Sequence, residues 1–330
     1  MTKVMADGGV ASPALVARLV QRGLVTRNGG VLQAKATIRQ GDRICIDGVI
    51  HTTVAGGADR LQLLADPSDA FEPRPVRLHA GLHKCLTLYF YKIYTHTAKL
   101  QSLSGRGLTD QATGFRHYYH RADGFSWRAA TTAIASLSGN AVDLTRFADI
   151  RVVRVVRDPR DLVVSGYHYH RKGVEHWCHY PEPQTVDWAM VGGMVSEPLA
   201  ASRLSLIDYL GQSSLDAGLR AEIAFRAQHF AALRAWADDP RVLVLRYEDI
   251  LGQEAQTTAR IARHFGWPAP IRIWASAVAN QFRAGRREVW SGHIRDPKAG
   301  QWRSAFSPEL TVEFARDWGD VLERYGYAAS

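Results

Sequence analysis

The segment around Arg157 constrains the fold of this chain more than any other. Residues 150–156 are mostly β-branched and predict a buried strand. Asp158 and Pro159 end that strand, because the residue before a proline is pushed out of the α region. Residues 160–169 then carry apolar side chains at helical spacing. Arg157 is therefore expected at the carboxyl end of a strand, the edge at which open α/β sheets bind ligands.

Arg157 and Ser165 suit a phosphate group. Ser165 lies about two helical turns beyond the arginine, near the start of the predicted helix. A guanidinium can donate two parallel hydrogen bonds to phosphate oxygens, and a nearby hydroxyl can add a third contact. The segment alone leaves one alternative open, which is a surface Arg–Asp ion pair at a strand end.

A second segment has the layout of a phosphate cradle. Residues 76–78 are strand-like, a loop with Lys84 follows, and residues 88–100 are long and apolar enough for a helix that opens at Thr87. The N–H groups at a helix N-terminus point at an anion, and a lysine adds positive charge. The GxxxxGK[ST] pattern of nucleotide triphosphatases is absent, since Cys85 stands where a hydroxyl would hold Mg²⁺. We predict a cradle without a metal ligand, with an ordinary strand–helix turn as the alternative.

Together the two segments resemble those of the sulfotransferases that use 3′-phosphoadenylyl sulfate (PAPS) as donor. In that family the first loop commonly reads Lys-x-Gly-Thr-Thr, and the second reads Arg-x-Pro-x-Asp-x-x-x-Ser. Segment 83–88 fits the first pattern with Leu86 in place of the glycine and Leu88 in place of the second threonine. Segment 157–165 resembles the second pattern closely.

Two later segments extend the resemblance over residues 75–327. Segment 242–250 resembles the family's strand that ends in Tyr-Glu-Asp, whose tyrosine, here Tyr247, lies near the adenine. Segment 294–302 resembles the Arg-Lys-Gly-x-x-Gly-Asp-Trp loop that closes over the donor, with Asp296-Pro297 replacing Lys-Gly, so Arg295 is the one contact carried over from it. The four pieces occur in the family's order, which is far more specific than any one of them.

The resemblance implies an α/β fold with a parallel sheet flanked by helices, the P-loop NTPase-like sulfotransferase fold. It also implies that Lys84 stabilises the leaving phosphate and that Arg157 and Ser165 bind the 3′-phosphate of the donor. Leu86 is expected to replace glycine only if its φ stays negative. The donor-binding residues implied in full are Lys84, Cys85, Leu86, Thr87, Leu88, Arg157, Ser165, Tyr247 and Arg295.

The acceptor hydroxyl needs a general base, and two histidines are candidates. Family members use a histidine or a glutamate after an early strand, and segment 116–123 lies in a comparable place. The two histidines face opposite sides of a strand, so one of them can point at the acceptor while the other does not. His120 is the first choice because it lies at the carboxyl end, and His117 is the second. The alternative is that both lie at the rim of an aromatic cluster. No metal is expected, since the His/Cys cluster at 176–179 matches no zinc-ligand spacing.

The chain divides by pattern into a small N-terminal α+β extension, residues 1–72, and a sulfotransferase-like α/β domain, residues 73–330. Asp47-Gly48 predicts a hairpin turn within the extension. Beyond residue 76, strands alternate with helices, which favours a parallel sheet. The predicted strands are 31–38, 42–47, 49–54, 76–79, 114–119, 150–156 and 241–247, and the predicted helices are 14–22, 88–100, 160–169, 221–237, 253–265 and 308–325.

Charge and composition limit the kinds of ligand and the cellular location that we expect for this protein. A net charge of +9 and a pI near 9.6 indicate anionic ligands, either PAPS or nucleic acid. The basic residues are dispersed and form no nucleic-acid-binding motif, so nucleic acid is not an expected partner. We expect neither a membrane span nor a signal peptide. Three widely spaced cysteines favour a reducing compartment, and the expected location is cytoplasmic.

The sequence therefore predicts a PAPS-dependent sulfotransferase that acts on a hydroxyl, or less readily an amine, of a small-molecule or carbohydrate acceptor. A P-loop kinase is one alternative, since it would share the fold, although the missing GK[ST] pattern counts against it. A non-catalytic binder of an anionic polymer, either nucleic acid or sulfated glycan, is the other.

Overall fold

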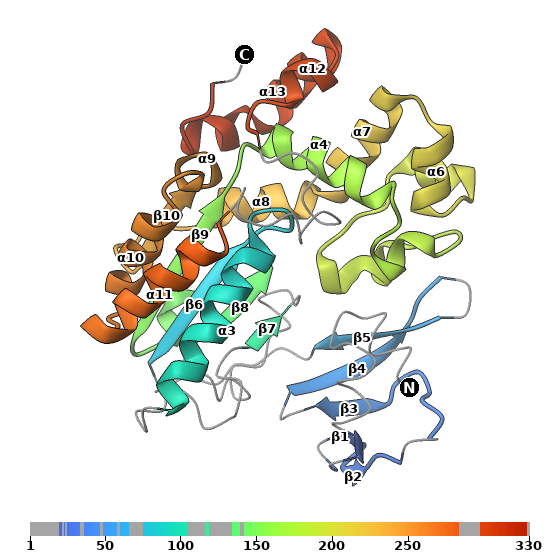
Figure 1. Ribbon diagram of the computed structural model, residues 1–330. Coiled ribbons are helices and arrows are strands. Elements are labelled where there is room, and N and C mark those ends of the chain that lie inside the picture. The colour runs from blue at the N-terminus through green and yellow to red at the C-terminus, as the bar shows by residue number, and fades with distance from the viewer. Residues whose placement is uncertain are drawn as a thin grey trace. The chain divides into compact units, whose positions relative to one another are not determined.

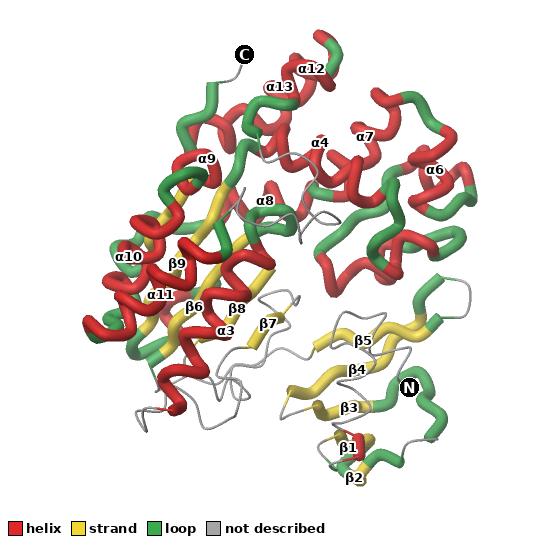
Figure 2. Tube along the Cα trace, in the orientation of Figure 1, coloured by secondary structure: helices red, strands yellow, loops and turns green. Residues whose placement is uncertain are grey.

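The computed structural model describes residues 20–21, 23, 25–33, 36–46, 49–57, 60–65, 75–103, 116–118, 134–138, 142–283 and 298–328 (Figures 1 and 2). The chain forms two compact units. The first contains Met1–Ala70, Tyr119–Ala129 and Gly166–Ala232, and the second contains Phe71–Tyr118, Ala130–Ser165 and Leu233–Ser330. The N-terminal segment thus shares a unit with the middle of the chain. A domain boundary between residues 72 and 73 stays a prediction.

The second unit is built on a parallel sheet in the order β10-β9-β6-β8-β7. Its central strands are rich in β-branched residues and buried along nearly their whole length, as expected for a sheet covered on both faces. The carboxyl ends of β6, β9 and β10 share one edge because the strands are parallel. The strands are β6 (Val76–Gly81), β7 (Arg116–Tyr118), β8 (Ile134–Ser138), β9 (Ile150–Val156) and β10 (Val242–Arg246).

Helices pack on both faces of this sheet. Figure 1 shows α3 (Thr87–Leu103), α10 (Glu254–His264) and α11 (Ala269–Gln281) together in front of it. On that face, His79 of β6 lies with its Nδ1 2.9 Å from the hydroxyl of Tyr94 in α3. His79 is in register with Val153, so Arg154, the next residue of β9, faces the opposite side. There its guanidinium lies 4.8 Å from the ring of Trp236.

The chain passes from the second unit into the first within α4 (Pro159–His170). The described helices include none that is long and apolar enough to cross a membrane. The remaining helices are α5 (Glu197–Ser202), α6 (Leu206–Gln212), α7 (Leu215–Phe225), α8 (Ala227–Ala235), α9 (Tyr247–Ile250), α12 (Trp302–Ala305) and α13 (Pro308–Arg324), and 3₁₀ turns lie at Leu144–Arg146, His176–His179 and Thr185–Val191.

An antiparallel sheet in the order β2-β1-β3-β4-β5 forms the N-terminal part of the first unit. Ile46 pairs with Val49, so the connection between β3 and β4 is the predicted two-residue hairpin. Among the described residues of the predicted strand over 31–38, only Val31 lies in a strand, in register with Thr26 of β1, and the N–H of Leu32 donates to the carbonyl of Val25 at 2.9 Å. The strands are β1 (Val25–Arg27), β2 (Gly30–Val31), β3 (Arg43–Ile46), β4 (Val49–Ala55) and β5 (Leu61–Ala65).

A buried aspartate joins this sheet to the middle of the chain. Asp187 accepts hydrogen bonds from the backbone N–H of Gly57 at 3.0 Å and of Gln184 at 2.9 Å. Arg60 donates to the same carboxylate from Nε at 3.2 Å and from Nη2 at 2.8 Å. Hydrogen bonds to a charged acceptor in a buried place are strong, so this cluster explains why residues far apart in sequence share one unit.

Most predicted elements of the second unit are confirmed, with differences that have local causes. The predicted helix over 221–237 is two helices, α7 and α8, which meet at Arg226. Its Nε donates to Glu222 at 2.7 Å, and both side chains are fully buried. Three strands were missed by the sequence patterns, β1 and β5 of the first unit and β8 of the second. Each is short and lacks the strict alternation that marks a half-buried strand.

Candidate active site

The loop after β6 and the N-terminus of α3 form the predicted cradle. Two of its residues have positive φ, Lys84 at 76° and Leu86 at 58°. A negative φ was the condition for Leu86 to replace the family's glycine, and that condition is not met. Leu86 adopts the left-handed conformation that glycine adopts most easily, at a strain cost of about 1–2 kcal/mol. The loop has a glycine-type backbone without the glycine.

Local hydrogen bonds hold this strained loop in shape. The carbonyl of Leu82 accepts from the N–H of Cys85 at 3.0 Å and from the hydroxyl of Thr87 at 3.5 Å. The N–H of Phe90 donates to the carbonyl of Leu86 at 3.0 Å, which starts the regular bonding of α3. Cys85 is fully buried, as expected for a small packing residue. The loop that carries Lys84 thus leads directly into the N-terminus of α3, the end of a helix that favours anions.

Arg157 follows β9 directly and is almost fully buried, at 3% exposure. Its guanidinium lies 4.2 Å from the ring centre of Tyr247, the first residue of α9. Its Nη2 is 3.9 Å from Asp161, which is long for an ion pair. Within the described part of the chain, its Nε has no acceptor. A buried charged donor that lacks an acceptor fits an anionic ligand at this position.

Ser165 lies on α4 at the spacing that the resemblance requires. Asp161 and Ser165 are four residues apart within α4, so their side chains lie on the same face of the helix, and Arg157 precedes the helix by two residues. Ser165 is half-buried. The structure therefore places the hydroxyl of Ser165 on the same helix face as Asp161.

Asp161 connects this helix to a segment near the C-terminus. Its carboxylate is buried and accepts the N–H of Gly300 at 2.7 Å and the N–H of Trp302 at 3.0 Å. Burial raises the pKa of Asp161, while the two N–H donors and the charge of Arg157 act in the opposite direction. Asp161, Gly300 and Trp302 all lie in the sequence motifs, but the motifs did not predict the hydrogen bonds between them.

Arg160 makes a second connection to the same segment. Arg160 donates hydrogen bonds to the carboxylate of Asp158 from its Nε at 3.0 Å and from its Nη2 at 2.9 Å. This bidentate geometry is that of a strong ion pair. The guanidinium of Arg160 lies 3.6 Å from the ring centre of Trp302. The Arg–Asp ion pair at this strand end is therefore between Arg160 and Asp158, and it is buried rather than at the surface.

Glu248 holds the strand ends of β9 and β10 together. One of its oxygens accepts the N–H of Asp158 at 3.1 Å, and the other accepts the hydroxyl of Tyr327 at 2.8 Å. Burial raises the pKa of the neighbouring Tyr247, so this ring stays neutral beneath the Arg157 guanidinium.

These features agree with a comparison to known families. The sulfotransferase domain model matches residues 143–326, more than half of the chain. The chain belongs to the sulfotransferase domain family. The match includes Arg157, Ser165 and Tyr247, whereas the Lys84 loop precedes it.

Solved structures give weaker likenesses to this sulfotransferase. A mouse sulfotransferase, SULT7A1, complexed with PAP, has a TM-score of 0.43 and 13% identity over 76% of this chain and 86% of its own. A retinol dehydratase in a complex with retinol and PAP has a TM-score of 0.42 and 15% identity over 93% of this chain and 94% of its own. No curated protein matches the sequence.

The structure brings together most of the donor-binding residues expected in this sulfotransferase. Lys84, Cys85, Leu86, Thr87 and Leu88 lie on the loop and first turn after β6, while Arg157, Ser165 and Tyr247 lie at the ends of β9 and β10. His120 and Arg295 lie outside the described residues. The backbone of His117 lies in β7, in register through Ser136 with His79, two residues before the end of β6. Its role as a base stays a prediction.

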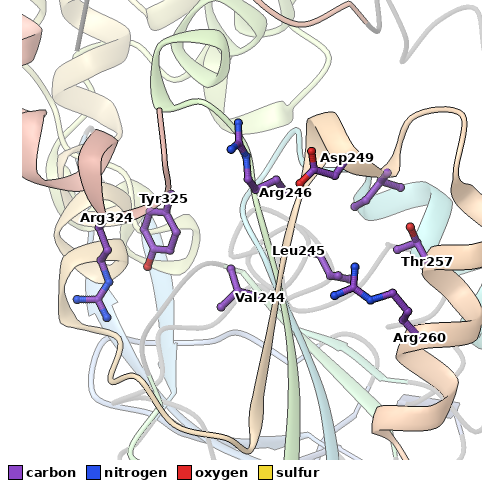
Figure 3. Close-up of a pocket in the computed structure, with 9 residues that line it drawn as sticks. Val244, Leu245, Arg246, Asp249, Thr257, Arg260, Arg324 and Tyr325 are labelled. Carbon is purple, nitrogen blue, oxygen red and sulfur yellow. The ribbon is translucent and has the colours of Figure 1, made fainter. Parts of the chain in front are cut away.

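A pocket of about 270 Å³ lies elsewhere in the second unit, beside β10 (Figure 3). Arg260 lines it from α10, and Arg324 lines it from the end of α13. Arg324 already donates to Asp238 at 3.0 Å. None of the expected donor-binding residues that the structure describes lines this pocket. Arg246, the residue before Tyr247, does line it.

Among the described residues, no group of three His, Cys, Asp or Glu side chains is arranged to hold a metal ion.

Proposed function

We propose that this sulfotransferase transfers a sulfuryl group from PAPS to a hydroxyl of a small-molecule or carbohydrate acceptor and releases adenosine 3′,5′-bisphosphate. The observation that supports this most is the guanidinium of Arg157, which is buried at a strand end with an Nε that lacks an acceptor among the described residues. A phosphate dianion would supply both the missing acceptor and the opposite charge.

The donor would be held at two points. The 3′-phosphate would bind Arg157 and Ser165, and the adenine would lie near Tyr247. The 5′-phosphate would accept N–H groups from Cys85 to Leu88 and the hydroxyl of Thr87, at the N-terminus of α3, with the Cys85 N–H and the Thr87 hydroxyl turning to it from the carbonyl of Leu82. Two anchors that far apart in sequence fix the direction of the bond that must break, which is the main requirement of an in-line transfer.

Chemistry at this site would depend on charge stabilisation. The bond between sulfur and the bridging oxygen of the donor breaks while a bond to the acceptor oxygen forms, so negative charge grows on the departing phosphate. Lys84 would stabilise that charge from its loop. The acceptor proton would pass to a general base, for which His120 and then His117 are our candidates.

We further propose that the acceptor group is a hydroxyl rather than an amine, and that the enzyme is cytoplasmic. Membership of the sulfotransferase family favours sulfuryl transfer over the kinase and polymer-binding alternatives.

The test is a thermal-shift titration with adenosine 3′,5′-bisphosphate, AMP and ATP. The bisphosphate should stabilise the wild type selectively, by about 2.7 kcal/mol at 100 times its Kd. Arg157→Ala should lose about 3 kcal/mol of that binding, or roughly 100-fold in affinity, because a charged hydrogen-bonded pair is removed.

Arg154→Met is the matched control. Arg154 is also a buried arginine of β9, but it packs on Trp236 on the other face of the sheet. This variant should lower the melting temperature and keep the selective response to the bisphosphate. Equal responses of the wild type to all three nucleotides would contradict the proposal.

A further inference from the structure

We propose that Asp161 is a positioning residue for the 3′-phosphate site, and that the Gly300–Trp302 segment keeps its carboxylate from neutralising Arg157. This inference rests on the proposed function, because it concerns the same phosphate. It adds a role for two residues of the Arg157 motif that do not themselves touch the donor.

The first step is the immobilisation of the Asp161 carboxylate. It is 1% exposed and accepts two backbone N–H groups, those of Gly300 and Trp302. Backbone donors do not rotate, so these two bonds fix the carboxylate more firmly than a side-chain partner would. Gly300 reaches this position with a φ of 80°, a conformation that favours glycine.

The second step is the effect on Arg157. The N–H groups of Gly300 and Trp302 each bind one oxygen of the carboxylate and hold it in place, with its Oδ2 3.9 Å from the Arg157 Nη2 rather than in a close bidentate pair. At that distance the charge still orients the guanidinium, which lies over the Tyr247 ring. The Nε of Arg157 is left for another acceptor. A close ion pair would instead compete with a phosphate for the same donors.

An independent contact keeps the segment in place. Arg160, held by Asp158, lies over the Trp302 ring at 3.6 Å. Two neighbouring residues of the motif thus bind the same segment, one through its backbone and one through its aromatic ring. Binding at Arg157 and order at Gly300–Trp302 are therefore linked, and linkage acts in both directions.

The test combines nucleotide affinity with amide hydrogen exchange in the full-length protein. In the wild type, adenosine 3′,5′-bisphosphate should slow exchange in the peptide that contains Gly300 and Trp302, and AMP should slow it less. Asp161→Ala should abolish this slowing and weaken bisphosphate binding about tenfold, with AMP affinity unchanged within about twofold. Asp161→Asn keeps the volume and one acceptor oxygen, so it should give a smaller loss of about threefold.

Gly300→Ala tests the other side of the contact. A Cβ there would lie 2.8 Å from Arg303, and the positive φ would be strained, so the N–H donors should shift. It should reduce the preference for the bisphosphate over AMP. Gly252→Ala is the matched control, because Gly252 has a φ of 79° and open space around its Cβ. That variant should lose similar stability and keep the preference.

The outcomes separate the two proposals. A wild type that does not prefer the bisphosphate overturns the proposed function and this inference with it. A wild type that prefers the bisphosphate, with Asp161→Ala and Asp161→Asn binding it as tightly or more tightly, overturns only this inference. If Asp161→Ala does not fold, the Asp161→Asn and Gly300→Ala results decide in the same way.

Discussion

Arg60 and Arg157 each lie beside a buried aspartate, one in each unit, but they are paired differently. Arg60 donates twice to Asp187, and the closer contact is 2.8 Å. Arg157 stays 3.9 Å from Asp161 and has an Nε without an acceptor in the described part of the chain. In an ion pair that only stabilises the fold, such as Arg60–Asp187, each charge is fully paired with the other, because an unpaired buried charge is costly in free energy. A site for an anion leaves a cation partly unsatisfied.

The largest expected effect is at the satisfied pair. Asp187→Ala removes the acceptor of Arg60 and of two backbone N–H groups, so we expect a loss of about 3–5 kcal/mol in unfolding free energy, measured by urea titration. Asp216→Ala is the control, since its 2.7 Å pair with Arg220 is exposed and should contribute less than about 1 kcal/mol. If the Asp187→Ala protein were as stable as this control, the Arg60–Asp187 pair would not be the stabilising pair that the comparison with Arg157 assumes.

Lys84→Ala should have the next largest effect, on catalysis rather than on folding. Removal of a cation that stabilises the leaving phosphate should lower kcat by about 10²–10³, with a smaller change in bisphosphate affinity. Lys92→Ala, a lysine further along α3, is the control and should leave kcat unchanged. Turnover by Lys84→Ala at the wild-type rate, once an acceptor is known, would remove Lys84 from this role.

His229 should make the first unit sensitive to acid. Burial, with the charge of Arg226, lowers the pKa of His229 to about 4, and its Nε2 lies 2.7 Å from the carbonyl of Val191. The unfolded chain, with a histidine pKa near 6.5, therefore binds more protons between pH 6.5 and 4. Stability should fall by about 3 kcal/mol as the pH drops through that window.

His229→Gln keeps an N–H donor for Val191 and removes this titration. Arg226, Glu222 and His170 also face His229 and are present in both proteins, so the difference between the two unfolding curves isolates His229. The two proteins should differ in the slope of stability against pH between 4 and 6.5. Parallel curves would show that His229 is not responsible.

Leu86→Gly should have the smallest effect. It removes the strain of a positive φ but adds flexibility to the unfolded chain, so we expect a gain below about 1 kcal/mol. Arg203→Gly is the control, because Arg203 has a φ of 59° at the C-terminus of α5 in the other unit. Both variants should keep selective binding of the bisphosphate. A loss of binding in Leu86→Gly alone would show that the leucine side chain, and not only its backbone, shapes the cradle.

Patterns that depend on neighbouring residues were predicted well. The strand over 150–156, the proline break and the helix after it follow from β-branching, backbone sterics and periodicity. The hairpin at Asp47-Gly48 is also a local feature. The strand β8 was missed because its pairing with β6 and β7 is a relation between distant segments.

The candidate site divides in the same way. Arg157, Ser165 and Lys84 were identified because each sits in a short motif at a strand end. The positive φ of Leu86 was not predicted, since a side-chain pattern does not report how much strain the surrounding hydrogen bonds can hold. The choice of partner for Asp158 was also beyond the sequence, because Arg157 and Arg160 both lie within two residues of it along the chain.

The sequence by itself determined the sulfotransferase motifs, the alternation of strands and helices, and the positive charge that suits an anionic donor, since all of these are local in the chain. Only the tertiary structure decided that Asp161 binds Gly300 and Trp302, that Asp187 joins residues 130 positions apart, and that Arg157 keeps a free Nε within the described residues. The reason is physical: burial and pairing of charges depend on which distant segments share a low-dielectric environment, and no local pattern encodes that choice.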